Sequence, residues 1–106
     1  MNTENASKLF ESLSSPIRLA IFRLLVVAGN RGIVAGDLAK DLNIAPNNLS
    51  FHLKQLSQCK MIHSMQEGRF IRYYANLNLM GELIGFLTES CCRDETIIEC
   101  QFRDSS

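Results

Sequence analysis

The hydrophobic spacing of this chain changes period partway along its length, and that change limits its fold more than any other feature. Residues 34–42 and 46–59 place apolar side chains at intervals of three or four, which predicts two short helices joined by a turn. Two strand-like runs follow at 61–65 and 69–75, with Gly68 between them. A glycine permits the positive φ of a tight turn, so these runs predict a β-hairpin.

Three more helices are expected around this unit, at 5–14, 16–28 and 77–90. Ser15 can cap the second of them, and Pro16 suits its first position because the missing N–H would be unpaired there. That helix is apolar nearly all round, which predicts that it is the central core helix. The last helix has a wide apolar face, of the kind that often marks an interface. The expected fold class is mainly α with one β-hairpin, a winged helix-turn-helix.

The length of 106 residues fits one domain with a modest core, so help from a dimer partner is expected. We expect a folded domain at 1–90 and an acidic, cysteine-containing tail at 91–106. No apolar run approaches the ~20 residues of a membrane span, and the polar N-terminus shows no secretory signal. The expected location is the reducing cytoplasm, where the four cysteines are expected to be thiols.

Charge is unevenly distributed along the chain, although the net charge is zero. Residues 40–75 carry five basic and two acidic side chains, a net charge of +3, whereas residues 76–106 carry a net charge of −4. A basic stripe on one face is the electrostatic footprint of a DNA-binding protein, and solvated surface charge is the alternative interpretation. With the predicted fold, this distribution favours double-stranded DNA rather than a membrane as the partner.

The outward face of the predicted helix at 46–59 is polar and suits a recognition helix. Asparagine and glutamine amides can pair with adenine in the major groove, and Lys54 can reach guanine or phosphate. Phe51 either touches a thymine methyl or packs on the protein, and His52 either contacts DNA or is a polar surface residue. The candidate DNA-contacting residues of this helix are Asn47, Asn48, Ser50, Phe51, His52, Lys54 and Gln55.

Two arginines on the predicted hairpin extend the candidate DNA surface. Arg69 lies at the turn and Arg72 follows three residues later, where an arginine can run along the DNA backbone or enter the minor groove. The alternative is that both are ordinary solubilising charges. Glu67 at the same turn would repel phosphate, which counts against a DNA contact there.

The cysteines fall into two groups. Cys59 lies on the core side of its helix and is expected to be a small buried residue rather than a ligand. Cys91, Cys92 and Cys100 lie beside or in the polar tail, where thiols have little packing value and suit a thiophilic ion. Zinc prefers four ligands and the tail has no histidine, whereas arsenite or antimonite, As(III) or Sb(III), is satisfied by three thiolates.

The tail thiols have other interpretations. They are either incidental or a redox switch, in which Cys100 is the favoured disulfide partner because a bond between the adjacent Cys91 and Cys92 is strained. For ion binding, a continuous helix would separate the Cα atoms of Cys92 and Cys100 by ~12 Å along its axis. The tail must then bend, or Cys100 must come from the partner chain.

Five motifs stand out between residues 6 and 88. They are Ser15-Pro16-Ile17-Arg18-Leu19-Ala20-Ile21-Phe22-Arg23-Leu24-Leu25, Asp37-Leu38-Ala39, Leu49-Ser50-Phe51-His52-Leu53-Lys54-Gln55-Leu56, Glu67-Gly68-Arg69 and Tyr73-Tyr74. In combination they resemble the ArsR/SmtB family of winged-helix metal-responsive repressors. The resemblance implies a homodimer joined through the first and last helices, operator DNA as partner, and release when the ion binds. It also implies that Ser50, His52 and Lys54 meet DNA.

Two departures from the family concern the ion site. Many arsenic-sensing members carry Cys-x-Cys at the start of the third helix, where this chain has Ile33-Val34-Ala35-Gly36-Asp37. Zinc-sensing members use histidine and acidic ligands on the last helix, and residues 77–90 contain no histidine. The tail cysteines instead resemble the C-terminal arsenic site of some members. Ala45 also departs from the family, because a capping serine is common there.

The sequence therefore predicts a transcriptional repressor, not an enzyme, that As(III) or Sb(III) releases from its operator through Cys91, Cys92 and Cys100. A redox-sensing repressor of the same fold is the alternative. A thiol enzyme is disfavoured because no Cys-x-x-Cys motif appears. A winged helix used only for protein contact would show no salt-sensitive DNA binding.

Overall fold

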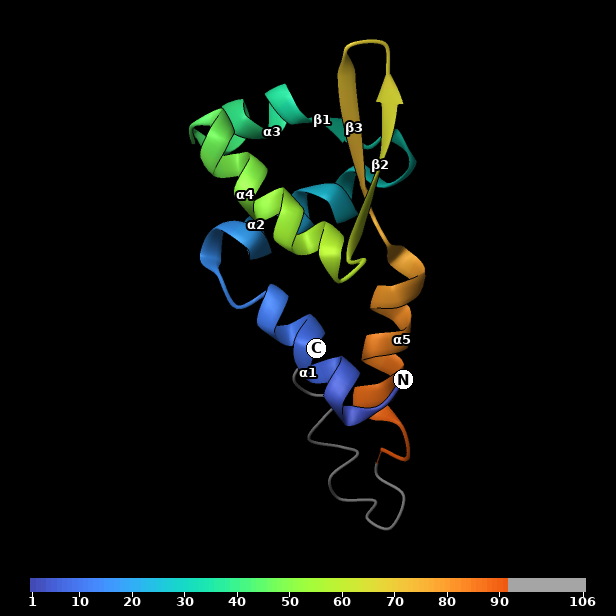
Figure 1. The fold of residues 1–106 in the computed structure, drawn as a ribbon. Helices are drawn as coiled ribbons and strands as arrows, with labels where there is room; N and C mark the ends of the chain where they lie inside the picture. Colours follow the sequence, from blue (N-terminus) through green and yellow to red (C-terminus); the bar gives the residue numbers. More distant parts are fainter. Residues whose placement is uncertain (92–106) are drawn as a thin grey trace.

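The computed structural model describes residues 1–91 of the chain. Five α-helices, one 3₁₀ turn and three short strands follow one another in this part (Figure 1). In chain order they are α1 (Thr3–Ser12), α2 (Pro16–Ala28), η1 (Gly29–Arg31), β1 (Ile33–Val34), α3 (Ala35–Leu42), α4 (Pro46–Gln58), β2 (Ile62–Glu67), β3 (Phe70–Ala75) and α5 (Leu77–Thr88). The predicted winged helix-turn-helix is confirmed.

The first two helices begin where side chains cap exposed backbone N–H groups. The side chain of Asn2 accepts a hydrogen bond from the N–H of Asn5 at 2.8 Å, and the hydroxyl of Ser15 accepts one from the N–H of Arg18 at 3.3 Å. Pro16 takes the first position of α2, as predicted. The Ser15 cap and Pro16 fix the break between α1 and α2.

Helix α2 packs against α3, α4 and β3, as expected of a core helix, and keeps one exposed stripe. Ile21, Phe22 and Leu25 are buried, whereas Leu19 is 43% exposed and Val27 is 81% exposed. Among residues 16–28 the exposed side chains follow one another at helical spacing: Pro16, Leu19, Arg23 and Val27. The apolar composition of α2 therefore overstates how much of the helix is buried.

The helix-turn-helix consists of α3 and α4. Asn43 adopts the left-handed conformation that ends α3, and the N–H of Ile44 donates to the carbonyl of Ala39 at 3.1 Å. Pro46 starts α4, and Ala45 before it supplies no side-chain cap. One face of each helix is sealed in the core by Leu38, Ala39, Leu49, Leu53 and Leu56.

The sheet has three antiparallel strands in the order β1-β3-β2, rather than the hairpin alone. Residues Ile33 and Val34 pair with Tyr73 and Arg72, so Val34 belongs to a strand and not to the predicted helix at 34–42. Gly32, just before β1, allows the backbone to approach β3 closely. Its φ is +59°, and a Cβ there would lie 2.7 Å from the carbonyl oxygen of Tyr73.

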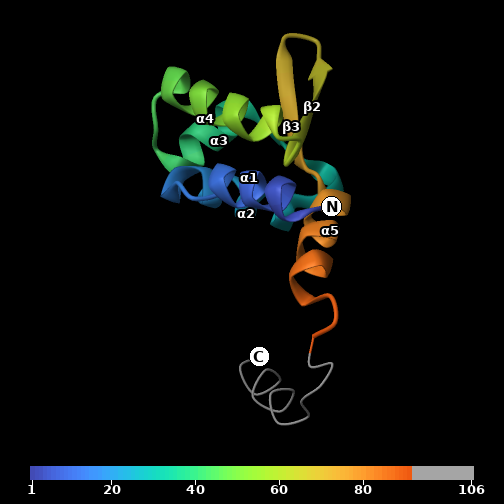
Figure 2. The ribbon, with the colours of Figure 1, turned by 60° about the horizontal axis from the view of Figure 1, so that its bottom comes forward.

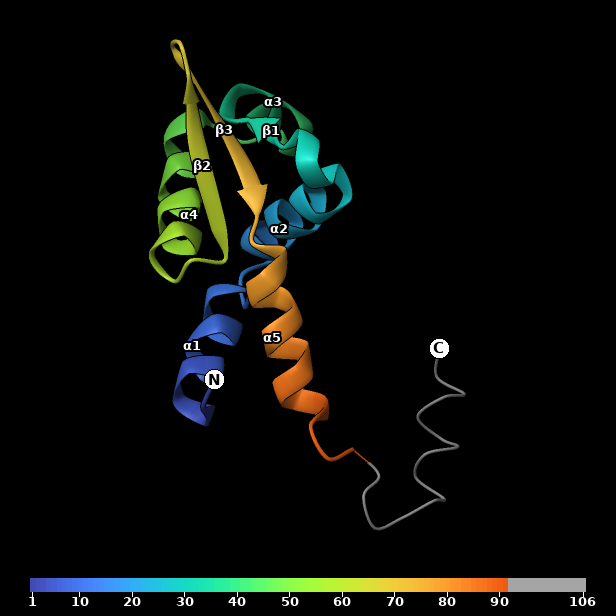
Figure 3. The same cartoon turned by 90° about the vertical axis from the view of Figure 1, so that its right-hand side faces the viewer.

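The hairpin of β2 and β3 forms the wing. The wing and α5 extend from the helical body in opposite directions (Figure 2). In the views of Figures 1 and 3, α1 and α5 lie at the end of the molecule away from the wing, and residues of both line one open pocket. Leu83 is the buried anchor of α5, and Ala6 and Leu9 anchor α1. Within residues 1–91 no single helix is long and apolar enough to span a membrane. Helix α1 and the α2–η1 stretch together have the length and composition of a span, but they are bent by 97° at the break between them.

Candidate nucleic-acid interface

The N-terminal end of α4 and the tip of the hairpin lie at the same end of the molecule, opposite α1 and α5 (Figures 1 and 3). The apolar face of α4 is buried, so its polar face points away from the core. Of the predicted contact residues on α4, His52 and Gln55 are half-buried; the exposed ones are Asn47, Asn48, Ser50, Phe51 and Lys54. All seven predicted residues of α4 thus lie outside its buried leucine face, and five of them are exposed.

The first turn of α4 offers hydrogen-bond donors to a ligand. The carbonyl oxygen of the Asn47 side chain accepts the backbone N–H of Asn48 at 3.0 Å, so its NH₂ group remains as a donor. Ala45 supplies no side-chain cap, Pro46 has no N–H, and the N–H of Asn48 is bonded, so the N–H of Asn47 is left in the first turn. An uncapped N–H group at a helix N-terminus carries a partial positive charge, which suits a DNA phosphate.

Phe51 is 55% exposed on this face. Its ring meets the imidazole of His52 edge-on, with the ring centroids 5.5 Å apart. The ring therefore makes a protein contact and still presents more than half of its surface. Contact with a thymine methyl remains a prediction.

His52 is tied to α2 through Arg18. A guanidinium nitrogen of Arg18 lies 3.3 Å from Nδ1 of His52, and the guanidinium Nε donates to the carbonyl of Ser12 at 2.7 Å. Because arginine can only donate, Nδ1 must be the acceptor, which leaves the proton of the neutral ring on Nε2. Burial, and then the charge of Arg18, lower the pKa of His52 below its ordinary value of 6.5. At neutral pH the ring of His52 is therefore an uncharged Nε2–H donor on α4.

Replacing Arg18 with methionine will raise the pKa of His52. The substitution removes the nearby positive charge, and NMR titration of the imidazole will show the shift. In the native chain the lowered pKa means that the unfolded state binds more protons between the folded pKa and 6.5. This contribution to stability is full above pH 6.5 and is lost as the pH falls through the folded pKa. An unchanged His52 titration in the Arg18→Met variant would contradict the assigned contact.

The wing places its two arginines in different environments. Gly68 and Arg69 form the turn, Gly68 with a φ of +62°, and the side-chain amide of Gln66 donates to the carbonyl of Gly68 at 2.8 Å. Arg69 is exposed there. Arg72 instead bonds both carboxylate oxygens of Glu67, at 3.1 and 3.0 Å.

The predicted ion ligands lie mostly beyond the part that the structure describes. Cys91 is exposed just after α5, and its backbone N–H donates to the carbonyl of Thr88 at 2.8 Å. Cys92 and Cys100 fall outside the described residues. Between residues 1 and 91 there is no group of three or more His, Cys, Asp or Glu side chains that could hold a metal. Cys59 is half-buried against the core, and its thiol donates to the carbonyl of Leu56 at 3.4 Å.

Sequence reasoning missed the supporting residues of this interface. Nothing in the sequence pairs Arg18 with His52, because they are 34 positions apart on different helices. The pairing of Glu67 with Arg72 could have been predicted from the strand register of the hairpin. A two-residue turn sets Glu67 opposite Phe70, which makes Arg72 its diagonal neighbour across the strands.

Comparisons with known proteins agree with this geometry. A helix-turn-helix domain family model matches residues 13–64. The chain is 31% identical to transcriptional repressor SdpR of Bacillus subtilis over 81 residues, which cover 76% of this chain and 87% of SdpR. The chain is also 41% identical over 70 residues to the uncharacterized HTH-type transcriptional regulator YdfF of the same organism. This match covers 66% of the present chain but only 30% of YdfF.

A solved structure supports the same assignment. The ArsR-like transcriptional regulator from Rhodococcus sp. RHA1 superposes with a TM-score of 0.69 at 27% identity, over 79% of this chain and 76% of that one. SdpR matches over most of both chains, and the described elements are those of a winged helix-turn-helix. The chain therefore belongs to the ArsR family of helix-turn-helix transcriptional regulators.

Proposed function

We propose that this chain is a homodimeric repressor that binds an operator through α4 and the wing and that As(III) or Sb(III) releases from it. One observation carries the DNA-binding role: the accessible polar face of α4 and the exposed Arg69 lie at one end of the molecule. The similarity to SdpR, a transcriptional repressor, supports repression. Two-fold symmetry would match the protein to an inverted-repeat operator.

The dimer proposal is supported by apolar surface at the opposite end. Phe10 of α1 is 42% exposed, and Leu77, Ile84 and Leu87 of α5 are 43%, 52% and 59% exposed. Leu77, Ile84 and Leu87 follow one another at helical spacing, and an exposed apolar face of this kind is typical of a protein interface. A partner's α1 and α5 would cover them.

The inducer proposal is supported by the chemistry of the thiols and by where they begin. Cys91 comes three residues after the end of α5, the helix that carries the exposed Leu77, Ile84 and Leu87. Thiolates are soft ligands that suit As(III) and Sb(III). Release also requires the ion to bind the DNA-incompetent form more tightly, because equal affinity for both forms shifts nothing. Ligation of the ion by thiolates at the end of α5 would alter the dimer interface and so the spacing of the two α4 helices.

Lys54→Ala tests the α4 face. The reduced protein is titrated by fluorescence anisotropy onto a duplex from the DNA directly upstream of its own gene, at several salt concentrations. If Lys54 meets phosphate, binding weakens and the slope of log K against log salt falls by about 0.9 for each phosphate that is no longer neutralised. Lys8→Ala removes the same charge from α1, at the far end, and is expected to leave both quantities unchanged. Equal effects of the two variants would contradict α4 as the DNA-binding element.

A further inference from the structure

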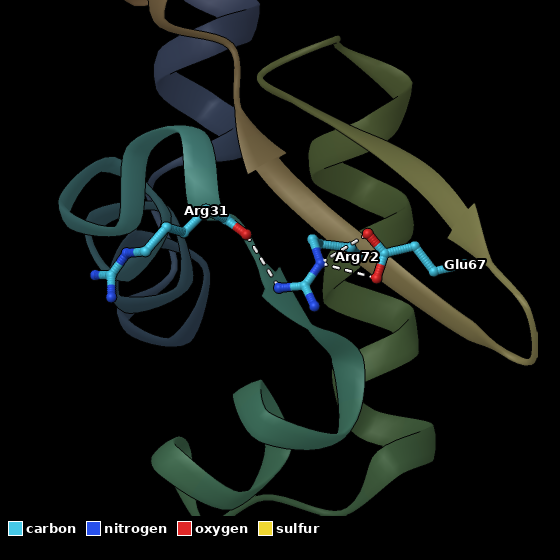
Figure 4. Close-up of polar contacts among 3 residues, drawn as sticks. All are labelled: Arg31, Glu67 and Arg72. Carbon is cyan, nitrogen blue, oxygen red and sulfur yellow. Dashed lines mark hydrogen bonds and ion pairs between the residues drawn. The ribbon is translucent and has the colours of Figure 1, made fainter.

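Arg72 on β3 links the end of β2 to η1, a turn that lies far away in the sequence (Figure 4). Its Nε lies 3.1 and 3.0 Å from the two carboxylate oxygens of Glu67, at the end of β2. Its Nη1 donates to the carbonyl of Arg31 in η1 at 3.0 Å. Because β3 is the central strand, one guanidinium spans the sheet from the edge strand to the 3₁₀ turn.

The strand register explains why this contact forms. Glu67 pairs with Phe70, and Met65 pairs with Arg72. Side chains of paired residues, and of residues two apart on one strand, share a face of the sheet. Glu67 and Arg72 are therefore diagonal neighbours on the same face, within reach of a long side chain.

The charge at the tip of the wing follows from this pairing. Glu67 and Arg72 form the ion pair found among residues 1–91, so their charges offset each other. Arg69, in the turn, has no ion-pair partner in the described part of the chain. The net charge that the tip presents is thus that of Arg69. The Glu67 and Arg72 side chains are 47% and 31% exposed, and pairs this exposed add little to stability, so charge placement is the more consequential effect.

We infer that Arg72 is a positioning residue and not a DNA contact. It holds the carboxylate of Glu67 away from the DNA backbone, braces the wing on η1, and leaves Arg69 to meet the phosphates or the minor groove. This inference rests on the proposed function, because it assigns the wing to the same DNA. It replaces the expectation that Arg72 itself touches DNA, since its guanidinium bonds to Glu67 and to the carbonyl of Arg31 within the protein.

Rescue separates the two roles of Arg72. Four proteins are compared on the upstream duplex by anisotropy: wild type, Arg72→Met, Glu67→Gln and the double variant. Arg72→Met exposes the carboxylate and is expected to weaken binding by about tenfold, whereas the double variant returns to within about threefold of wild type. The salt slope of the double variant should equal that of wild type, because every phosphate remains neutralised as before.

A different result would overturn the inference. If Arg72 contacts phosphate, the double variant stays as weak as Arg72→Met and its salt slope falls by about 0.9 per phosphate. If Arg72 only braces the wing on η1, Glu67→Gln again fails to rescue, but the salt slope is unchanged. The NMR shift of the Arg72 Nε–H, measured without DNA, is expected to move in Glu67→Gln, and a fixed shift would show that the pair is absent. A wild-type chain that binds no DNA overturns the proposed function, and the Nε–H shift then decides the pairing by itself.

Discussion

Replacing Leu87 with glutamate is expected to dissociate the dimer and weaken operator binding by at least about 100-fold. Leu87 is 59% exposed on α5, beside the 52% exposed Ile84, in the surface proposed to meet the partner. A carboxylate buried there without a partner costs several kcal/mol, which association through a modest interface cannot offset. Loss of the dimer also removes the second recognition helix, and with it the gain from binding two half-sites together.

Sedimentation and anisotropy measure the two consequences separately. Val27→Glu is the matched control, because Val27 is 81% exposed on α2 and borders a hollow shared with Asp41 and Leu42 of α3, away from α5. It introduces the same charge and should leave the dimer and the DNA affinity intact. A Leu87→Glu protein that stays dimeric and binds as wild type would place the interface elsewhere.

Removal of one tail thiol is expected to weaken As(III) binding by at least about tenfold, or about 1.4 kcal/mol. The variant is Cys92→Ser, and calorimetry of the reduced protein without DNA gives the affinity. Three thiolates satisfy As(III), and the loss of one leaves a poorer donor set. Cys59→Ser is the control, because the Cys59 thiol is half-buried and already donates to the carbonyl of Leu56.

The outcomes of this titration also distinguish regulation by As(III) from regulation by thiol oxidation. Equal As(III) affinity in the Cys92→Ser and wild-type proteins would exclude Cys92 as a ligand. Absence of As(III) binding, together with a 2 Da mass loss and DNA release after peroxide, would instead establish the thiol-redox alternative. Cys100→Ser then reports whether two thiols suffice.

The helices and the hairpin could be predicted because their signals are local. Apolar spacing marks each helix, and Ser15, Pro16 and Gly68 mark where elements begin or turn. Strand β1 was missed because two residues carry no periodicity, and Ile33 and Val34 became a strand only by pairing with β3. The exposure of Val27 was missed because composition reports how apolar a helix is and not how much of it one chain covers.

The candidate interface shows the same division between local and long-range information. The outward residues of α4 follow from its buried leucines, so their placement was predictable. The link from Arg18 to His52 depends on how α2 packs against α4, which no local pattern encodes. The position of Arg72 on the wing was predicted, but its bond to the carbonyl of Arg31 requires the tertiary approach of η1.

The most direct measurement is fluorescence anisotropy of the reduced wild-type protein on its upstream DNA, titrated with arsenite. Salt-sensitive binding that is lost as arsenite is added, and retained at higher arsenite in Cys92→Ser, is the expected result. Tight binding that saturating arsenite leaves unchanged would contradict the proposed inducer, and absence of salt-sensitive DNA binding would contradict the proposed regulator.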